Sequence, residues 1–149
     1  MPCCATCATK NATEVIYLDT SALVKLVLDE AHSQDLADWL DERTQIRWIT
    51  SMLADVELPR AIIRTGRLDG LASVPTVLAR LDRFEIDDVV RTTAAAYRDP
   101  ALRTLDAIHL ATASVAASVS ALDSIVTYDS RLAAAASALK MATAAPGSR

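Results

Sequence analysis

The sequence predicts a single α/β domain with helices on both faces of a central parallel sheet. Short apolar runs alternate with helical segments along the chain, which is typical of βαβ units. The run 15–18 is apolar at every position, as expected for a strand that helices cover on both faces. A chain of 149 residues is long enough to bury a real core within one domain.

Composition narrows the class further. Only 3 Gly, 5 Pro and 4% aromatic residues argue against an all-β or disordered chain. The net charge is −4, so any nucleic-acid activity must depend on a local basic rim and on metal ions. The longest charge-free stretch, 107–122, contains a histidine and several serines and is too short to span a bilayer, so we expect no membrane segment.

The periodicity of apolar residues assigns the elements in order. We expect strands at about 14–18, 46–50, 84–86, 124–128 and 140–144. We expect helices at about 21–28, 33–42, 51–64, 74–83, 89–98, 104–118 and 130–139. Pro59 should bend or break the third helix, while Gly66 and Gly70 bracket a turn.

The first residues differ from the rest. Cys3, Cys4 and Cys7 all lie there, and the last two form a CxxC pair. A structural zinc site normally needs four ligands, and His32 and His109 are distant in sequence, so zinc is disfavoured. Residues 1–13 lack the apolar core of a signal peptide. We therefore expect a flexible tail at 1–13, a domain at 14–146 and a reducing, cytoplasmic location.

Two acids follow predicted strands. Asp19 comes directly after the first strand and Asp129 after the strand at 124–128. Either could simply cap the helix that follows it. Ligands of open α/β sheets bind just beyond the carboxyl ends of such strands, however, so both positions are also suited to chemistry.

Two further acids lie in early helical turns. Glu57 is expected to share a helix face with Leu53 and Val56, where it needs solvent or a cation; the alternative is a surface pair with Arg60. Asp106 lies in the first turn of a helix, where the helix dipole alone would favour an acid. His109 lies one turn later, where it either orients Asp106 or is a core histidine.

These four acids should converge on one edge of a right-handed parallel sheet. Two unit charges about 4 Å apart repel by roughly 4 kcal/mol at an effective dielectric near 20. Some of the carboxylates must therefore be protonated, or divalent cations must neutralise them. Mg²⁺ and Mn²⁺ prefer such oxygen ligands, and paired ions activate water for phosphodiester cleavage.

Four segments carry a family resemblance. The segments 17–25 (YLDTSALVK), 56–61 (VELPRA), 102–113 (LRTLDAIHLATA) and 126–132 (VTYDSRL) resemble the PIN-domain ribonuclease toxins of VapBC toxin–antitoxin modules. The similarity covers about 14–146. The resemblance implies a PIN-like three-layer α/β/α sandwich with a central parallel sheet. It also implies Mg²⁺- or Mn²⁺-dependent RNA endonuclease activity. It also implies a homodimer and a cognate VapB-like antitoxin that blocks the site.

The resemblance assigns roles to individual residues. The matching positions of the catalytic acidic quartet are Asp19, Glu57, Asp106 and Asp129. Asp19 and Asp106 would be the principal metal ligands, with Asp129 completing the cage directly or through water. Thr127 would hydrogen-bond near the metal and Ser21 would lie beside it, where both would contact the substrate. The basic residues Lys25, Arg60, Arg64 and Arg103 flank the acids in sequence, and we expect them to contact RNA phosphates.

Other classes fit less well. A HAD-type phosphatase expects a second Asp two residues after the first, but position 21 is Ser. A response-regulator receiver needs paired acids in an early loop and a lysine after a late strand, and neither is evident in this sequence. A catalytically inactive PIN-fold binding module is the remaining alternative, and the presence of all four acids weakens it.

Overall fold

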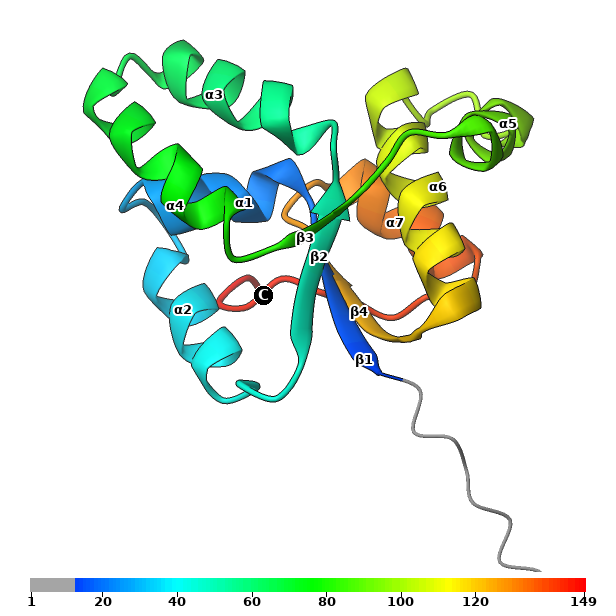
Figure 1. The fold of residues 1–149 in the computed structure, drawn as a ribbon, viewed down its shortest axis with the longest axis horizontal. Coiled ribbons are helices and arrows are strands. Elements are labelled where there is room, and N and C mark those ends of the chain that lie inside the picture. The colour runs from blue at the N-terminus through cyan, green and yellow to red at the C-terminus, as the bar shows by residue number, and fades with distance from the viewer. Residues whose placement is uncertain (1–12) are drawn as a thin grey trace, which may run out of the picture.

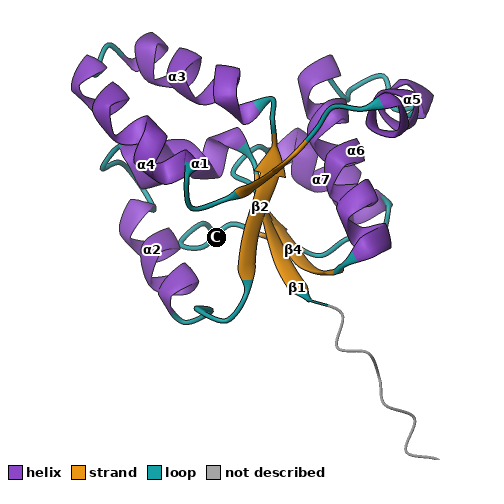
Figure 2. Ribbon diagram, in the orientation of Figure 1, coloured by secondary structure: helices purple, strands orange, loops and turns teal. Residues whose placement is uncertain are grey.

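The fold is known from a computed structural model, which describes residues 13–149. The three cysteines and nearly all of the expected tail lie outside the described residues. Within them, five parallel strands form one sheet in the order β3-β2-β1-β4-β5. They are β1 (Glu14–Leu18), β2 (Arg47–Ser51), β3 (Asp82–Phe84), β4 (Ala121–Val126) and β5 (Thr143–Ala144). Figure 2 shows this sheet at the centre of the molecule.

Helices cover both faces of the sheet (Figure 1). One layer contains the helices between β1 and β3, and the other contains those between β3 and β5. The first layer comprises α1 (Thr20–Val27), α2 (Ser33–Asp41), α3 (Ala54–Thr65), the 3-10 helix η1 (Leu68–Ser73) and α4 (Val74–Leu78). The second comprises α5 (Asp88–Ala96), α6 (Thr104–Val119) and α7 (Ser130–Ala138). The predicted α/β sandwich is confirmed.

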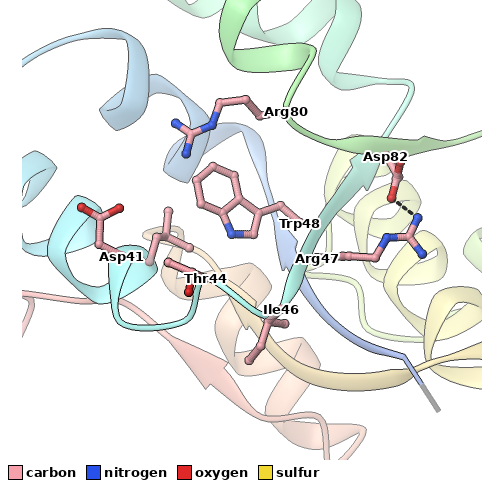
Figure 3. Close-up of a pocket in the computed structure, with 8 residues that line it drawn as sticks. Asp41, Thr44, Ile46, Arg47, Trp48, Arg80 and Asp82 are labelled. Carbon is pink, nitrogen blue, oxygen red and sulfur yellow. Dashed lines mark hydrogen bonds and ion pairs between the residues drawn. The ribbon is translucent and has the colours of Figure 1, made fainter. Parts of the chain in front are cut away.

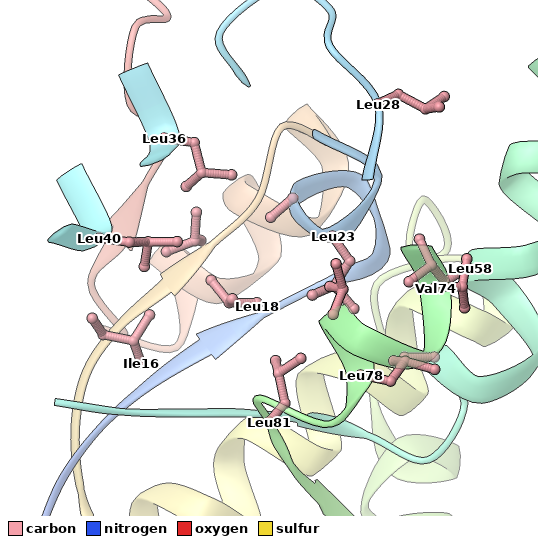
Figure 4. Close-up of a cluster of buried hydrophobic side chains, with 14 of the residues drawn as sticks. Ile16, Leu18, Leu23, Leu28, Leu36, Leu40, Leu58, Val74, Leu78 and Leu81 are labelled. Carbon is pink, nitrogen blue, oxygen red and sulfur yellow. The ribbon is translucent and has the colours of Figure 1, made fainter. Parts of the chain in front are cut away.

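The central strand β1 contributes to two separate cores because alternate side chains point to opposite faces. Ile16 and Leu18 pack into the cluster under the first helical layer, which Figure 4 shows. Val15 and Tyr17 pack into the cluster under the second layer. Tyr17 pairs in register with Ile49 of β2 and with Ile125 of β4, so β1 is held on both edges. Asp19 therefore leaves the sheet from its most rigid strand.

Several element boundaries differ from the sequence-based expectation. The helix expected at 74–83 ends at Leu78, because Asp82–Phe84 is extended and pairs with β2. The strand expected at 84–86 therefore lies two residues earlier. Pairing with β3 also extends β2 through Ser51, so α3 begins at Ala54 instead of residue 51. At the other end, β4 stops at Val126 and leaves residues 127–129 in a turn.

Helix α3 departs from the expectation in two ways. It runs from Ala54 to Thr65 with Pro59 inside it, so of the expected bend or break the break does not occur. Its buried face consists of Ala54, Leu58 and Ile62, whereas Val56 is 65% exposed. The inward face predicted from Leu53, Val56 and Glu57 is therefore wrong, because the helix is rotated so that Leu58 faces the core. None of the helices in 13–149 combines the length and the hydrophobicity needed to cross a bilayer.

Candidate active site

Asp19 follows β1 and is held by three donors. Its Oδ1 accepts hydrogen bonds from the backbone N–H of Ala22 (3.0 Å) and from Oγ of Ser21 (2.6 Å). Its Oδ2 accepts from Oγ1 of Thr127 (2.7 Å). Asp19 thus caps α1 and is at the same time a fixed carboxylate, only 4% exposed. Burial raises its pKa above the ordinary aspartate value, although the charge of His109 and these hydrogen bonds oppose the rise.

The turn after β4 is bound to the same carboxylate. Thr127 Oγ1, which donates to Asp19, accepts from the backbone N–H of Asp129 (3.1 Å). Ser21 Oγ accepts from the backbone N–H of Tyr128 (2.8 Å). Oδ1 of Asp129 caps α7 by accepting from two N–H groups of its first turn, and Oδ2 accepts no hydrogen bond among the described residues. The ends of β1 and β4 therefore form one connected unit.

Glu57 lies on α3 and is bound by two donors at one oxygen. Its Oε2 accepts from Oγ1 of Thr20 (2.6 Å) and contacts Nε2 of His109 at 2.5 Å. Burial alone would raise the pKa of Glu57, but the hydrogen bond and charge of His109 and the hydroxyl of Thr20 outweigh it, so the pKa is lowered. The alternative interpretation, a surface pair of Glu57 with Arg60, finds no ion pair among residues 13–149. His109 contacts Glu57 and not Asp106.

Asp106 is the least restrained of the four acids. It lies in the first turn of α6, is half-buried, and its side chain makes no hydrogen bond within residues 13–149. Burial raises its pKa, and the negative charges of Asp129 and Asp19 raise it further, while His109 and Arg103 oppose the rise. A carboxylate that is repelled by two others and bound to no donor would be stabilised by a proton or by a cation.

All four predicted acids line a single cleft of about 220 Å³. Its remaining lining residues come from α1, α3 and α6 and are Thr20, Ser21, Val24, Ala61, Arg64 and His109. The four acids therefore do lie together at the carboxyl edge of the sheet, as predicted. Their catalytic and metal-binding roles remain predictions.

The predicted substrate-binding residues occupy different places. Ser21 lines the cleft, and both its hydroxyl and that of Thr127 are engaged with Asp19. Lys25 does not line the cleft, because its Nζ binds Glu30 Oε1 (2.9 Å) and lies 4.6 Å from the ring centre of Tyr128. Arg60 is exposed outside the cleft. Substrate contact by these residues remains a prediction.

Two residues of the site, Thr20 and Tyr17, had no role in the sequence-based expectation. For Tyr17 a signal was available, because a hydroxyl in an otherwise apolar buried strand needs a polar partner. Arg64, which we expected to contact phosphate, does line the cleft: Glu57, Ala61 and Arg64 lie at i, i+4 and i+7 and so share a face of α3. Its contact with phosphate stays a prediction.

A larger hollow of about 480 Å³ lies at the start of β2 and β3, away from the four acids (Figure 3). Both of its arginines already have a partner. Arg47 pairs with Asp82, and the guanidinium of Arg80 lies 4.2 Å from the ring centre of Trp48. We therefore assign no part of the site to this hollow.

The sequence profile of the PIN domain matches residues 16–138, which include all four acids of the cleft. The chain belongs to the PIN-domain family. It is 65% identical over 133 residues to "Ribonuclease VapC35" of Mycobacterium tuberculosis, and this match covers 89% of the chain and 98% of that protein. It is 41% identical to "Ribonuclease VapC46" of the same organism, over 88% of the chain and 97% of that protein. The resemblance to VapC toxins is therefore confirmed.

A solved structure gives independent support for the fold. The chain resembles the crystal structure of PAE2754 from Pyrobaculum aerophilum with a TM-score of 0.52 and 24% sequence identity. The match covers 89% of the chain and 88% of that structure. Membership of the PIN-domain family sets aside the HAD-type phosphatase and the receiver domain.

Proposed function

We propose that this chain is a metal-dependent endoribonuclease and the toxin of a type II toxin–antitoxin module, acting in the cytoplasm. Residues 14–146 would form the catalytic PIN domain and residues 1–13 an appended tail. The observation that carries the proposal is the convergence of four acids on one cleft in a chain 65% identical to a VapC ribonuclease. An inactive PIN-fold module would have no need to keep this costly cluster of charges.

The donor set fits Mg²⁺ or Mn²⁺. As the side chains stand, no three acidic, histidine or cysteine residues within 13–149 are grouped closely enough to hold an ion. Asp106, however, has no hydrogen-bond partner there and is free to turn toward a cation. Asp19, Asp106 and Asp129 would hold the ion, since carboxylate oxygens are the ligands these cations prefer. A bound ion of this kind would activate water and stabilise the leaving oxygen.

The protein's own groups would then do the positioning. Asp19 would stay fixed because Ser21, Ala22 and Thr127 hold both of its oxygens. Glu57, whose lowered pKa keeps it ionised, would accept a proton from the attacking water through its free Oε1. Arg64, which lines the cleft, would donate hydrogen bonds to a phosphate oxygen of the RNA.

The antitoxin would cover both the cleft and α3. An arginine from the antitoxin would pair with the acids in place of the metal. Four large apolar side chains are exposed in this region: Met52 just before α3, Val56 and Ile63 on α3, and Leu68 at the start of η1. We call them the apolar stripe. An amphipathic helix of the antitoxin would bury this stripe beside α1. Homodimer formation is proposed on the family resemblance alone.

Cleavage of total cellular RNA by the purified chain, with and without EDTA, tests the nuclease. We expect cleavage with Mg²⁺ or Mn²⁺ and none with EDTA, since the cation would both activate the water and stabilise the leaving oxygen. Cleavage that persists in EDTA would contradict the metal requirement. RNA binding without cleavage under all metal conditions would favour the inactive module.

Growth assays test the toxin. Expression of the chain alone should arrest growth, and co-expression of the product of the adjacent small gene should restore it. A harmless chain that binds no product of an adjacent gene would refute the toxin assignment, although the nuclease assignment could still hold.

A further inference from the structure

A buried polar chain connects the middle of the sheet to the cleft. The hydroxyl of Tyr17, on the central strand β1, lies 2.7 Å from Nδ1 of His109. Nε2 of the same ring lies 2.5 Å from Oε2 of Glu57. Tyr17 is fully buried and His109 is 3% exposed, whereas the Glu57 side chain is 19% exposed and lines the cleft. These two contacts therefore connect the buried core to the cleft.

The direction of the terminal hydrogen bond follows from the charges. Oε2 of Glu57 already accepts a hydrogen bond from Thr20 Oγ1, and a glutamate carboxylate, ionised at neutral pH, has no proton to donate. An unprotonated Nε2 at 2.5 Å from it would place two acceptors in contact. Nε2 of His109 must therefore carry the hydrogen and donate it to Glu57. In that tautomer Nδ1 carries no hydrogen, and the hydroxyl of Tyr17, 2.7 Å away, can donate to it.

The two donors act on the same oxygen of Glu57. Thr20 Oγ1 donates to Oε2 at 2.6 Å, and Nε2 of His109 donates to that atom as well. No hydrogen bond of the described residues involves Oε1. The carboxylate is consequently held in one orientation, with Oε1 left for a water molecule or cation in the cleft.

We propose that His109, itself oriented by Tyr17, is a positioning residue that fixes Glu57 so that only Oε1 is presented to the reacting water. This inference rests on the proposed nuclease function and adds to it a device outside the acidic quartet. Simple core packing does not account for the pair, because an apolar ring at either position would fill the same space without the need for a buried polar partner. The Tyr17 and His109 rings meet edge to face, with centroids 5.9 Å apart, which also fixes the plane of the imidazole.

Imidazole nitrogen NMR tests the hydrogen bond without any activity measurement. The chain has only two histidines, so the His32→Gln variant assigns the remaining ring to His109. In metal-free protein we expect Nε2 to carry a hydrogen whose proton signal lies far downfield, because its acceptor is charged. The Glu57→Gln variant should move this signal upfield. An unprotonated Nε2, or a signal that Glu57→Gln leaves in place, would overturn the inference.

Kinetics with paired variants test the positioning role. His109→Leu removes the donor, whereas the amide nitrogen of His109→Gln can occupy the place of Nε2. We expect His109→Leu to lower kcat about 10–100-fold with little change in KM, as for other residues that orient a reacting group. His109→Gln should recover most of that loss. Tyr17→Phe should lower kcat by a smaller factor, since it loosens the ring but leaves the donor.

Thr112→Val is the matched control. Thr112 is buried on the same helix, but its hydroxyl donates only to the carbonyl of Ile108, so kcat should not change. Equal activity of the wild type and His109→Leu, or equal loss in the Leu and Gln variants, would refute positioning while leaving the nuclease intact. If His109→Leu does not fold, the Gln and Tyr17→Phe variants decide by the same comparison. A wild-type chain that cleaves no RNA would instead contradict the proposed function, and the NMR result would still decide the hydrogen bond.

Discussion

Replacing Asp19 by Asn and by Ala separates its structural role from its chemical one. Both substitutions remove the carboxylate from the predicted metal cage, so both should reduce RNA cleavage to near background. The Asn variant keeps an oxygen that can accept the N–H of Ala22 and cap α1. The Ala variant keeps none and leaves Ser21 and Thr127 without their acceptor.

The magnitudes follow from these contacts. Loss of an N-cap costs about 0.5–2 kcal/mol, and a buried donor without its acceptor costs about 1–3 kcal/mol. The free energy of unfolding of Asp19→Ala should therefore lie about 2–4 kcal/mol below that of Asp19→Asn. In a chain of this size that corresponds to a melting temperature roughly 5–15 °C lower.

The Asn variant should also be more stable than the wild type when metal is absent. Burial raises the folded-state pKa of Asp19, so the folded chain binds a proton there more tightly than the unfolded chain does. The contribution of this group to stability is then fully present below the unfolded pKa, near 3.8, and is lost as pH rises through the folded value. The advantage of Asp19→Asn should therefore be largest at neutral pH and shrink toward pH 4.

Thermal melts followed by circular dichroism in EDTA, at a series of pH values, measure the stabilities, and cleavage of cellular RNA with Mn²⁺ measures activity. Full activity of purified Asp19→Asn would refute the metal-site assignment. Equal melting temperatures of the Asn and Ala variants would refute the capping argument. An Asn advantage that grows as pH falls would contradict the sign of the pKa shift.

Three further outcomes are expected. Cleavage should weaken in mildly acidic buffer, at higher pH than an ordinary aspartate would cause, because the pKa of Asp106 is raised and its protonated form releases metal; an initial-rate profile between pH 5 and 8 checks this. RNA affinity should fall with salt, and Arg64→Ala should weaken binding and flatten the salt dependence, whereas Arg47→Met, in the hollow away from the four acids, should alter neither. Gly147→Ala should loosen the C-terminal segment, because alanine is strained at the φ of 83° found there and its Cβ would displace the side chains of Asp35 and His32; faster amide exchange at residues 144–148 would report it.

The sequence by itself determined the class of fold and the four acids. An all-apolar strand such as 15–18 has to be buried on both faces, and a carboxylate directly after it has to lie at the carboxyl edge of the sheet. Asp19 and Asp129 could be placed in this way because each follows a strand, and neither placement depends on which helix packs nearby.

Only the tertiary structure decided what each acid contacts and where the helices turn their faces. The rotation of α3 depends on packing by Leu58 and Ile62, and it brings Glu57 to His109, which is 52 positions away. The end of α4 depends on the pairing between β2 and β3. The position of the Lys25 side chain depends on its contacts with Glu30 and with the ring of Tyr128. These contacts join residues far apart in the chain, and local periodicity holds no information about them because each depends on how separate elements pack.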